Sequence, residues 1–532
     1  MQGCSIPEVF TRITDYVDHF AVTTPDAEAV VFGNERMTYK ELKFRVDRCA
    51  RALLASGVSK GDRVAMLCTS RPEFWVVFLA TTGIGAVWVG LNPKYRMDEC
   101  HHVVGDSEPL LLFSLAEFEG RHYGEEIAVL ISEHECLETV VSIGGDLPGA
   151  ESFDEFLDRA DRTDVVSYRV ACSLVERLDP AMIVYTSGST GKPKGAVLSH
   201  FGLAFGATMQ TRHFSVERPS LTCSFPINHV ASVADTCATT LIKGGKIVFQ
   251  ERFDPGSTLA AIAAESCTIW AGVPTMFQLQ LSHLDFPTTD MSSVELVVWG
   301  GAAMPRGDIA RLEKLGARLM AVYGMTETSA HVTYTEEGVS VDVLSESVGR
   351  PDRLCPCRIV DAGGGTCAVG ETGELQFKGE LMMLGYWRRP DATSGAFTSD
   401  GWLRTGDTGF RREDGNIQIA GRLSEMFKSG GYNVYPREIE AVLESHPSVS
   451  MAAVIGVPDD LYQEVGHAYV LIEPDGLVSE EELDGFCKNR LANYKVPKRF
   501  FIRDELPMLP VGKIDKTALK KKTIKKEENN RG

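Results

Sequence analysis

The stretch TSGSTGKPKG, from Thr186 to Gly195, combines glycines, hydroxyl side chains and lysines in one short segment. Glycine lets backbone N–H groups approach an anion closely, hydroxyls add hydrogen-bond donors, and lysines add positive charge. Phosphate is the ligand that this combination suits. The segment alone leaves a second interpretation open, a flexible glycine-rich turn with no ligand.

The segment is not a Walker-type phosphate loop. A GxxxxGK[ST] motif has four residues between its glycines and a hydroxyl after its lysine. Here only Ser189 and Thr190 separate Gly188 from Gly191, and Pro193 follows Lys192. The flanking runs AMIVYT and AVLSH are both strand-like, so we expect the loop to connect a hairpin rather than to begin a helix.

Four further stretches accompany the loop: VYGMTETS at 322–329, GWLRTGDTGF at 401–410, GRLSEMFKSGGYNVYPREIE at 421–440 and PVGKIDK at 510–516. Together, and in this order, the five motifs resemble those of the adenylate-forming superfamily of acyl-CoA synthetases, luciferases and peptide-synthetase adenylation domains. The resemblance covers most of the chain. It implies an enzyme that joins a carboxylic acid to ATP, releases pyrophosphate and passes the acyl group to a thiol, with Mg²⁺ and coenzyme A as partners.

The resemblance also implies an ATP site. Tyr323 would stack on adenine, Thr326 would donate to the α-phosphate, and Glu327 would hold magnesium, because a hard cation prefers carboxylate oxygen. Asp407 would accept both ribose hydroxyls, with Arg422 as a further donor. Alone, Glu327 is also typical of a helix start, and Asp407 of a β-turn. The predicted ATP-binding residues are Thr186, Ser187, Gly188, Ser189, Thr190, Gly191, Lys192, Gly301, Ala302, Tyr323, Gly324, Thr326, Asp407, Arg422 and Lys513.

The C-terminal motifs resemble the mobile part of such enzymes. Lys513 matches the lysine that reaches the α-phosphate and carboxylate only during adenylation, a role that suits a point charge on a flexible stem. Ser424 stands at the hinge, where the family usually has aspartate or lysine, so it lacks a charge that could bias the two domain orientations. An ordinary surface lysine is the alternative for Lys513. The predicted coenzyme A contacts are Lys428, Ser429, Gly430 and Gly431, for which a plain turn is the alternative.

The acid would bind beside FPINHVAS at 225–232. His229 stands where many acyl-CoA synthetases close on the carboxylate, although a packed histidine is the alternative. Val230 and Ala231 follow it, where amino-acid-activating relatives have an aspartate, so we disfavour an amino acid substrate. We expect a medium-length, aromatic or alicyclic acid. The predicted acyl pocket is His229, Val230, Trp299, Gly300, Gly301 and Met325, and the predicted catalytic residues are Lys513, Thr326, Glu327, His229 and Lys428.

Two other reactions share the adenylation motifs. A carrier protein could replace coenzyme A as the acceptor, or oxygen could replace the thiol, as in luciferases. Acid-dependent release of pyrophosphate, measured with and without coenzyme A, separates these alternatives. A non-catalytic binding module is a further alternative, which undiminished pyrophosphate release after Lys513→Ala would favour.

Alternating β-rich and amphipathic segments must position these residues. RVAMLC at 63–68, AVWVG at 86–90, AMIVYT, KIVFQ at 246–250, CTIWAG at 267–272 and ELVVWGG at 295–301 predict parallel sheets with crossover helices. Glycine turns after about 349 predict a small β-rich subdomain. We therefore expect an α/β fold with a large N-terminal domain (1–422, its β-rich subdomain at about 349–422), a small mobile α+β domain (424–518) and a disordered tail (519–532).

Composition is that of a globular protein, with 44% hydrophobic and 24% charged residues. The formal charge of −19 disfavours nucleic acid as a partner. The charge-free run at 74–91 is interrupted by Gly83 and Gly85, which argues against a membrane span. Thirteen scattered cysteines and the absence of a secretory signal predict a cytoplasmic protein without a cysteine-based metal site. A homodimer is left open.

Overall fold

The large domain is built on an eight-stranded sheet with the order β21-β11-β10-β4-β3-β5-β8-β9. The computed structural model describes residues 9–186, 193–430, 432–459, 461–473, 476–508 and 514–531, without the side chains of 433 and 524–531. The five central strands run parallel, as predicted, and β4 and β5 are buried along their whole length, which is typical of a sheet covered on both faces. The strands are β3 Arg63–Leu67, β4 Val87–Leu91, β5 Leu111–Leu115, β8 Thr139–Ile143, β9 Glu151–Ser152, β10 Pro180–Thr186, β11 Lys194–Ser199 and β21 Gly385–Tyr386.

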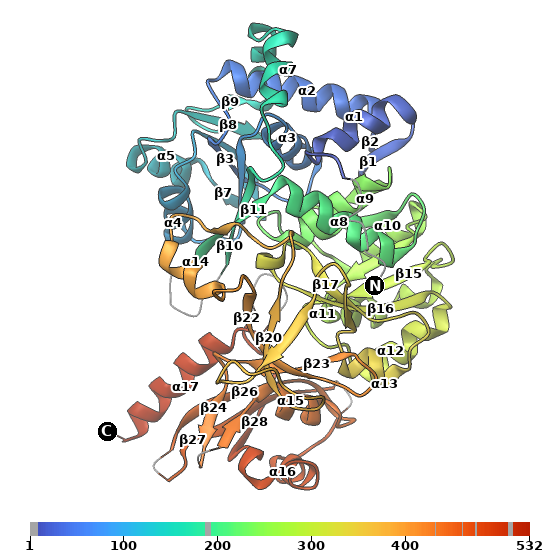
Figure 1. Ribbon diagram of the computed structural model, residues 1–532, viewed down its shortest axis with the longest axis vertical. Helices are drawn as coiled ribbons and strands as arrows, with labels where there is room; N and C mark the ends of the chain where they lie inside the picture. Colours follow the sequence, from blue (N-terminus) through green and yellow to red (C-terminus); the bar gives the residue numbers. More distant parts are fainter. Residues whose placement is uncertain are drawn as a thin grey trace.

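Helices cover both faces of this sheet (Figure 1). The charge-free run divides at its glycines into helix α3, which begins at Pro72, and strand β4. No helix in the described ranges is long and apolar enough to cross a membrane. The helices of this part are α1 Thr14–Thr23, α2 Tyr39–Ala55, α3 Pro72–Gly83, α4 Met97–Ser107, α5 Gly124–Glu133, α6 Phe153–Asp158, η1 Arg159–Arg162 and α7 Val165–Ser173, and a short hairpin pairs β6 Glu117–Phe118 with β7 Arg121–His122.

Two further sheets complete the α/β part. A four-stranded sheet has the order β12-β13-β1-β2, and a five-stranded sheet has the order β14-β15-β16-β17-β18 with its first three strands parallel. Their strands are β1 Glu28–Phe32, β2 Glu35–Thr38, β12 Ser220–Cys223, β13 Lys246–Phe249, β14 Ile269–Gly272, β15 Leu296–Trp299, β16 Arg318–Gly324, β17 His331–Tyr334 and β18 Arg350–Pro351. The helices are α8 His200–Phe214, the π-helix η2 Ala231–Ala238, α9 Thr239–Ile242, α10 Pro255–Ala264, α11 Pro274–Leu281, η3 Phe286–Thr288, α12 Arg306–Leu312, η4 Glu313–Leu315, η5 Thr326–Thr328 and α13 Val341–Glu346.

A four-stranded antiparallel sheet follows, in the region where glycine turns predicted a β-rich subdomain. Its order is β19-β20-β22-β23, with β19 Cys357–Val360, β20 Gly373–Phe377, β22 Leu403–Arg411 and β23 Ile417–Arg422, and α14 Pro390–Ala396 lies between β21 and β22. β23 ends at Arg422 and the next strand begins at Phe427, so the predicted boundary at Ser424 falls in the turn between the two strands.

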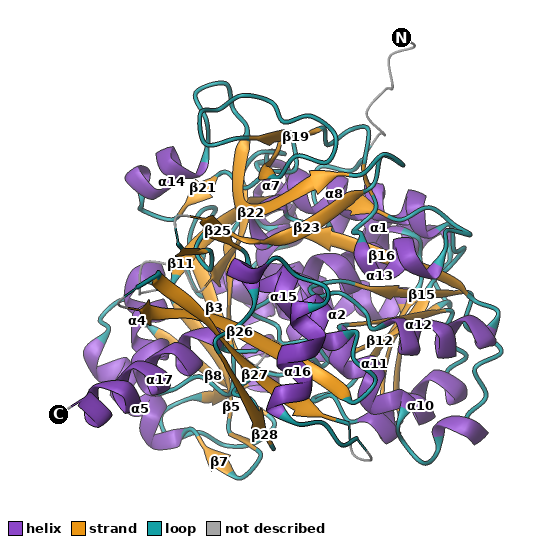
Figure 2. Ribbon diagram, turned by 90° about the horizontal axis from the view of Figure 1, so that it is seen from below, coloured by secondary structure: helices purple, strands orange, loops and turns teal. Residues whose placement is uncertain are grey.

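The C-terminal part forms its own sheet, which lies below the large domain in Figure 1 and in front of it in Figure 2. Ala452 and Val454 of β26 pack in one apolar cluster with α15 and α16, whereas Ala453 and Ile455 pack in a second cluster on the other face. This alternation is the period of a strand. The elements are β24 Phe427–Ser429, β25 Tyr432–Val434, α15 Pro436–Glu444, β26 Val449–Asp459, β27 Gln463–Ile472, α16 Glu480–Lys488, η6 Asn493–Lys495, β28 Arg499–Arg503 and α17 Lys516–Arg531.

The prediction of a disordered tail over 519–532 was wrong, because helix α17 runs from Lys516 to Arg531. Leu519 is buried in the second apolar cluster of the small domain. The hydroxyls of Thr523 and Tyr469 are 2.6 Å apart. The lysine-rich composition concealed this helix, whose first turns are held by the buried Leu519, the Thr523 hydroxyl and the ion pairs of Lys516 with Glu425 and Glu440.

His200, at the start of α8, is fully buried, and neither ring nitrogen has a hydrogen-bond partner in the described part of the chain. Burial lowers its pKa to about 4. The His200 imidazole therefore takes up a proton near pH 6.5 in the unfolded chain but only near pH 4 in the native protein. The free energy of unfolding falls as the pH drops from 6.5 to 4. Between pH 7.5 and 5 we expect a loss of about 2 kcal/mol in the free energy of unfolding.

Urea unfolding of the wild type and His200→Phe at the two pH values measures this loss. The phenylalanine variant has no proton to take up at this position, so its pH dependence should be weaker by that amount, whatever its stability at pH 7.5. Equal pH dependence in both proteins would contradict the assignment.

Candidate active site

The predicted hairpin of the glycine-rich loop is confirmed by the strands that flank it. β10 and β11 are antiparallel, with Thr186 paired to Lys194. The Thr186 hydroxyl lies 3.5 Å from the Lys194 carbonyl oxygen. The remaining predicted loop residues, Ser187, Gly188, Ser189, Thr190, Gly191 and Lys192, lie outside the described residues.

Asp407 joins two of the other predicted ATP-binding side chains. The Tyr323 hydroxyl donates to its Oδ2 at 2.6 Å, and Arg422 forms an ion pair with it, with Nε 2.9 Å from Oδ1. The register explains the second contact, because Asp407 on β22 is the cross-strand partner of Arg422 on β23. Asp407 is 5% exposed, whereas the Arg422 side chain is 54% exposed. A buried acceptor therefore lies under a cation that extends into solvent.

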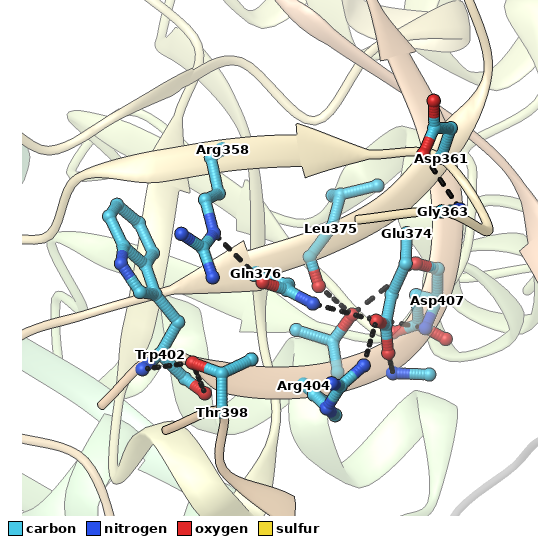
Figure 3. A network of polar contacts seen from close by, with 12 residues as sticks. Arg358, Asp361, Gly363, Glu374, Leu375, Gln376, Thr398, Trp402, Arg404 and Asp407 are labelled. Carbon is cyan, nitrogen blue, oxygen red and sulfur yellow. Dashed lines mark hydrogen bonds and ion pairs between the residues drawn. The ribbon is translucent and has the colours of Figure 1, made fainter. Parts of the chain in front are cut away.

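The backbone around Asp407 is held by the polar contacts drawn in Figure 3. The Asp407 N–H donates to the Thr405 hydroxyl at 3.0 Å, and that hydroxyl donates to the Leu375 carbonyl at 2.8 Å. Arg404 pairs with Glu374 on the neighbouring strand β20. The carboxylate therefore keeps a fixed direction, which suits a group that must accept hydrogen bonds from a ligand.

Tyr323 remains a hydrogen-bond donor at physiological pH. Burial, and then the charge of Asp407, hold the pKa of its hydroxyl well above the usual range. The ring is half-buried beside Phe377, with ring centroids 6.0 Å apart. Asp407 also raises the pKa of Arg422, so the guanidinium stays charged.

Glu327 lies in the short helix η5 and connects the YGMTE segment to the edge of the eight-stranded sheet. The Tyr386 hydroxyl donates to its Oε1 at 2.7 Å, and the Met383 N–H donates to its carbonyl oxygen at 2.8 Å. Tyr386 is on β21, where it pairs with Ala196 of β11. Thr326 and Glu327 are both 7% exposed. Sequence reasoning missed Tyr386, since no motif marks it.

The predicted acyl-pocket residues differ in their accessibility. Gly300 and Met325 are partly accessible and Gly301 is exposed, with a φ of +82° that suits glycine. Trp299 is only 1% exposed and belongs to an apolar cluster with residues of α12. Because side chains alternate along a strand, Trp299 lies on the face of β15 opposite Val298 and packs in the core. Val230 is also buried.

His229 precedes the π-helix η2. Its Nδ1 accepts the N–H of Ala231 at 3.1 Å, so the neutral ring carries its proton on Nε2. That nitrogen is then the donor with which the imidazole can approach a carboxylate.

The predicted coenzyme A contacts lie on the small domain. Lys428 is exposed on β24, and its backbone N–H donates to Glu464 at 3.1 Å. Ser429 is buried and pairs with Tyr432 and Gln463, and Gly430 has a φ of +56°. Lys428 and Ser429 therefore end strand β24, and Gly430 lies in the turn that follows it. Gly431 and the predicted catalytic Lys513 lie outside the described residues.

An ion pair that sequence reasoning missed lies next to the predicted hinge. Lys516 Nζ is 2.6 Å from Glu425 and 2.7 Å from the buried Glu440. Glu425 follows Ser424 directly, and Lys516 begins α17. Lys516 is therefore paired with the residue that follows the predicted hinge.

Two family models and several known proteins match this chain over most of its length. A family model described as AMP-binding enzyme matches residues 17–387, and one described as AMP-binding enzyme C-terminal domain matches residues 438–513. Feruloyl-CoA synthase from Amycolatopsis sp is 35% identical over 94% of this chain and 96% of that protein. Indoleacetate–CoA ligase from Aromatoleum aromaticum is 30% identical over 97% and 99%. ATP-bound MatB from Rhodopseudomonas palustris superposes with a TM-score of 0.83 at 27% identity, covering 96% of this chain and 99% of that one.

Proposed function

The chain belongs to the AMP-binding enzyme family and is an AMP-forming acid–CoA ligase; from this premise we propose which residues carry out the reaction and which acids it uses. The observation that supports the proposal most strongly is the buried Asp407 between Tyr323 and Arg422. An acceptor-only carboxylate in a fixed direction suits the two hydroxyls of a ribose.

In the first step the acid's carboxylate attacks the α-phosphorus of ATP and pyrophosphate leaves. Two anions must meet, so the reaction needs donors and positive charge where negative charge develops. The loop from Thr186 to Lys192 supplies hydroxyls, backbone N–H groups and a lysine. Thr326 donates to the α-phosphate, Lys513 adds charge, and His229 orients the carboxylate through Nε2–H. Gly301 and Ala302, which are both exposed, and the backbone of Gly324 contact the nucleotide.

Glu327 is the residue that would hold Mg²⁺. Its carboxylate is a hard oxygen donor, and Tyr386 fixes its Oε1. The described residues contain no group of three metal-ligating His, Cys, Asp or Glu side chains. A magnesium ion at Glu327 would be held by one carboxylate, phosphate oxygens and water. The ion would neutralise charge on the phosphates of ATP.

Glu327→Gln is expected to lower the rate of adenylation about 100-fold at low Mg²⁺, with partial rescue at high Mg²⁺, because the amide keeps the volume but loses the charge. Pyrophosphate release measured over a magnesium titration tests this. Tyr386→Phe is the matched control, since it removes only the hydrogen bond and should cost a few-fold. A magnesium dependence unchanged in Glu327→Gln would contradict the metal assignment.

In the second step the thiol of coenzyme A attacks the acyl-adenylate and AMP leaves. We propose that the small domain turns about Ser424, so that Lys428, Ser429, Gly430 and Gly431 replace Lys513 beside the adenylate. Glycine would let the pantetheine arm pass close to the backbone. The anchor of Lys516 on Glu425 means that the hinge and the lysine segment move together.

The proposed acids are medium-length, aromatic or alicyclic. Both curated relatives described above act, by their names, on aryl-substituted acids, feruloyl and indoleacetate.

The cysteines of the described part are free thiols, which supports a cytoplasmic enzyme. A homodimer is the assembly to test by light scattering.

The test is a panel of carboxylic acids incubated with MgATP, with and without coenzyme A, followed by identification of products. The proposal expects AMP, pyrophosphate and an acyl-CoA for aryl or medium-length acids. Turnover confined to acetate, transfer only to a carrier protein, or oxygen uptake would contradict it.

A further inference from the structure

The residue before His229 is held by a tyrosine from a distant part of the chain that the proposed reaction does not use. Asn228 Nδ2 donates to the Tyr95 hydroxyl oxygen at 2.7 Å. The other polar atom of this amide, Oδ1, is buried and has no hydrogen-bond partner in the described ranges. Within those ranges, Tyr95 is therefore the one polar partner of the Asn228 side chain.

His229 ends a tight turn in which both central residues are fixed. The His229 N–H donates to the Pro226 carbonyl oxygen at 3.1 Å, so Ile227 and Asn228 are the central residues of the turn. Ile227 is fully buried in the large apolar core, and Asn228 is held by Tyr95. Because a rotation of the turn would carry the His229 backbone with it, these two side chains set the position of the imidazole.

The Asn228 backbone also lies directly on strand β4. A Cβ on Gly90, a residue of β4, would be 2.8 Å from the Asn228 Cα, which is closer than a Cβ can approach a backbone carbon. Glycine inside a strand is typical of such a close approach by another backbone. Strand β4 and the loop that follows it therefore hold Asn228 from two sides, through Gly90 and through Tyr95.

Hydrogen bonds to the backbone hold the loop that carries Tyr95. Arg121 Nη1 donates to the carbonyl oxygens of Pro93 at 2.9 Å and Tyr95 at 2.6 Å, and the Tyr123 hydroxyl donates to that of Pro93 at 2.8 Å. Arg121 is fixed in turn by Glu126, with Nη2 2.7 Å from Oε2. Burial raises the pKa of Tyr95 to about 12, so its hydroxyl is neutral at physiological pH. Tyr95 thus presents a neutral hydroxyl from a fixed backbone.

This loop lies at the edge of the eight-stranded sheet where the glycine-rich segment begins. β4 is parallel to β10, so the carboxyl ends of the two strands lie side by side. The loop with Tyr95 follows β4, and Thr186 ends β10. In parallel α/β sheets, ligands bind outside the carboxyl ends of the strands. Tyr95 is therefore on the side of the sheet where the reaction is proposed to occur.

We propose that Tyr95 is a positioning residue for adenylation, because through Asn228 it fixes the turn from which His229 meets the carboxylate of the acid. The inference rests on the proposed function, in which His229 orients that carboxylate through Nε2–H. The His229 Nδ1 accepts the Ala231 N–H, so the direction of the ring follows the backbone at 229–231. A displacement of this backbone moves Nε2 relative to the acid. Misplacement of a reacting group by about 1 Å can lower a rate about 100-fold.

Tyr95→Phe removes the hydroxyl and keeps the ring. We expect kcat/KM for the acid to fall about 10-fold, because the loss of one hydrogen bond displaces the turn only in part. The KM for ATP should change less than about 2-fold, since no proposed nucleotide contact is altered. Initial rates of pyrophosphate release, with the panel acid of highest turnover and with ATP each titrated in turn, measure these constants.

Asn228→Leu tests the same bond from its other side. It should lower kcat/KM for the acid by a similar factor, and the double variant Tyr95→Phe/Asn228→Leu should lose no more than Asn228→Leu alone, because both substitutions remove one interaction. Losses that multiply in the double variant would show that the two side chains act separately, which would overturn the inference.

A cycle with His229→Ala separates positioning from a general loss of packing. If Tyr95 acts through His229, Tyr95→Phe should cost about 10-fold in the wild-type background and less than about 2-fold in the His229→Ala background. Tyr168→Phe is the matched control, because Tyr168 of α7 is a half-buried tyrosine whose hydroxyl donates to Asp47 of α2 at 2.8 Å. It should leave the constants of both backgrounds unchanged.

A folded Tyr95→Phe protein with a wild-type kcat/KM for the acid would overturn the inference. So would an equal loss in the two backgrounds, or a KM for ATP that rises as much as the KM for the acid. If His229→Ala slows adenylation and Tyr95→Phe does not, the positioning role alone fails. Failure of the proposed function gives a different result: His229→Ala would have wild-type rates, or no acid of a broad panel would cause release of AMP from ATP.

Discussion

Lys513→Ala is expected to slow formation of the acyl-adenylate by about 100- to 1,000-fold. The expectation has two grounds. Lys513 in PVGKIDK matches the lysine that acts during adenylation, and negative charge must be stabilised when pyrophosphate leaves. The lysine acts only in the first step, so transfer of a preformed acyl-adenylate to coenzyme A should change less than about 3-fold. Rapid-quench assays of the two half-reactions, the second started from synthetic acyl-adenylate, measure both values.

Lys520→Ala is the matched control for this experiment. Lys520 is an exposed lysine of α17, in the same C-terminal segment, and we expect both half-reactions to be unchanged. If Lys513→Ala slowed both half-reactions equally, the lysine would not be specific to adenylation, and the proposed exchange of Lys513 for Lys428 would be wrong.

Asp407→Ala is expected to lower kcat/KM for ATP about 100-fold, mainly through KM. Two hydrogen bonds from ribose hydroxyls to a carboxylate are lost, each worth about 1.5–3 kcal/mol, and water recovers part of this. The substitution also leaves the Tyr323 hydroxyl without its acceptor and Arg422 without its counter-ion. Initial rates over an ATP titration, with saturating acid and coenzyme A, give the two constants.

Asp400→Ala provides the control for a general effect on the subdomain. Asp400 pairs with Arg358 on the same antiparallel sheet, and its hydrogen bonds lower its pKa to about 2, but its described partners do not include Tyr323, Asp407 or Arg422. We expect an unchanged KM for ATP. An Asp407→Ala protein that is folded and has a wild-type KM for ATP would show that this carboxylate does not bind the ribose.

Local sequence was sufficient to predict the elements that hold the site. α3 begins at a proline and ends at a glycine, and α15 begins at a proline. Uninterrupted apolar runs mark β4 and β10. Residues close together in the sequence are therefore sufficient to predict these elements. The hairpin around the glycine loop followed from two strand-like runs in close succession. Such features depend on few residues and are visible in a single sequence.

Contacts between distant residues could not be predicted in this way. The hydrogen bond from Tyr386 to Glu327 spans 59 residues, and no motif marks the tyrosine. The hydrogen bond from Asn228 to Tyr95 spans 133 residues and depends on the packing of a turn against β4. The family resemblance gave Tyr323 and Asp407 as residues of one site, but their direct contact across 84 residues appears only in the fold.

The tail shows where composition misleads. Lysines between 519 and 526 suggested disorder, yet Leu519 is buried against the sheet and Lys516 is paired with Glu425 and Glu440. Trp299 ends an apolar strand at the predicted pocket, and the alternation of β15 places its side chain in a core cluster, an orientation that composition does not reveal.

A pulse–chase with ATP labelled at the α-phosphate is the most direct test of the two-step reaction. Enzyme, labelled MgATP and an aryl acid should first accumulate one labelled acyl-adenylate per active site, and added coenzyme A should convert all of it to labelled AMP and unlabelled acyl-CoA in a single turnover. Labelled ADP as the nucleotide product, or an adenylate that coenzyme A leaves intact, would contradict the reaction.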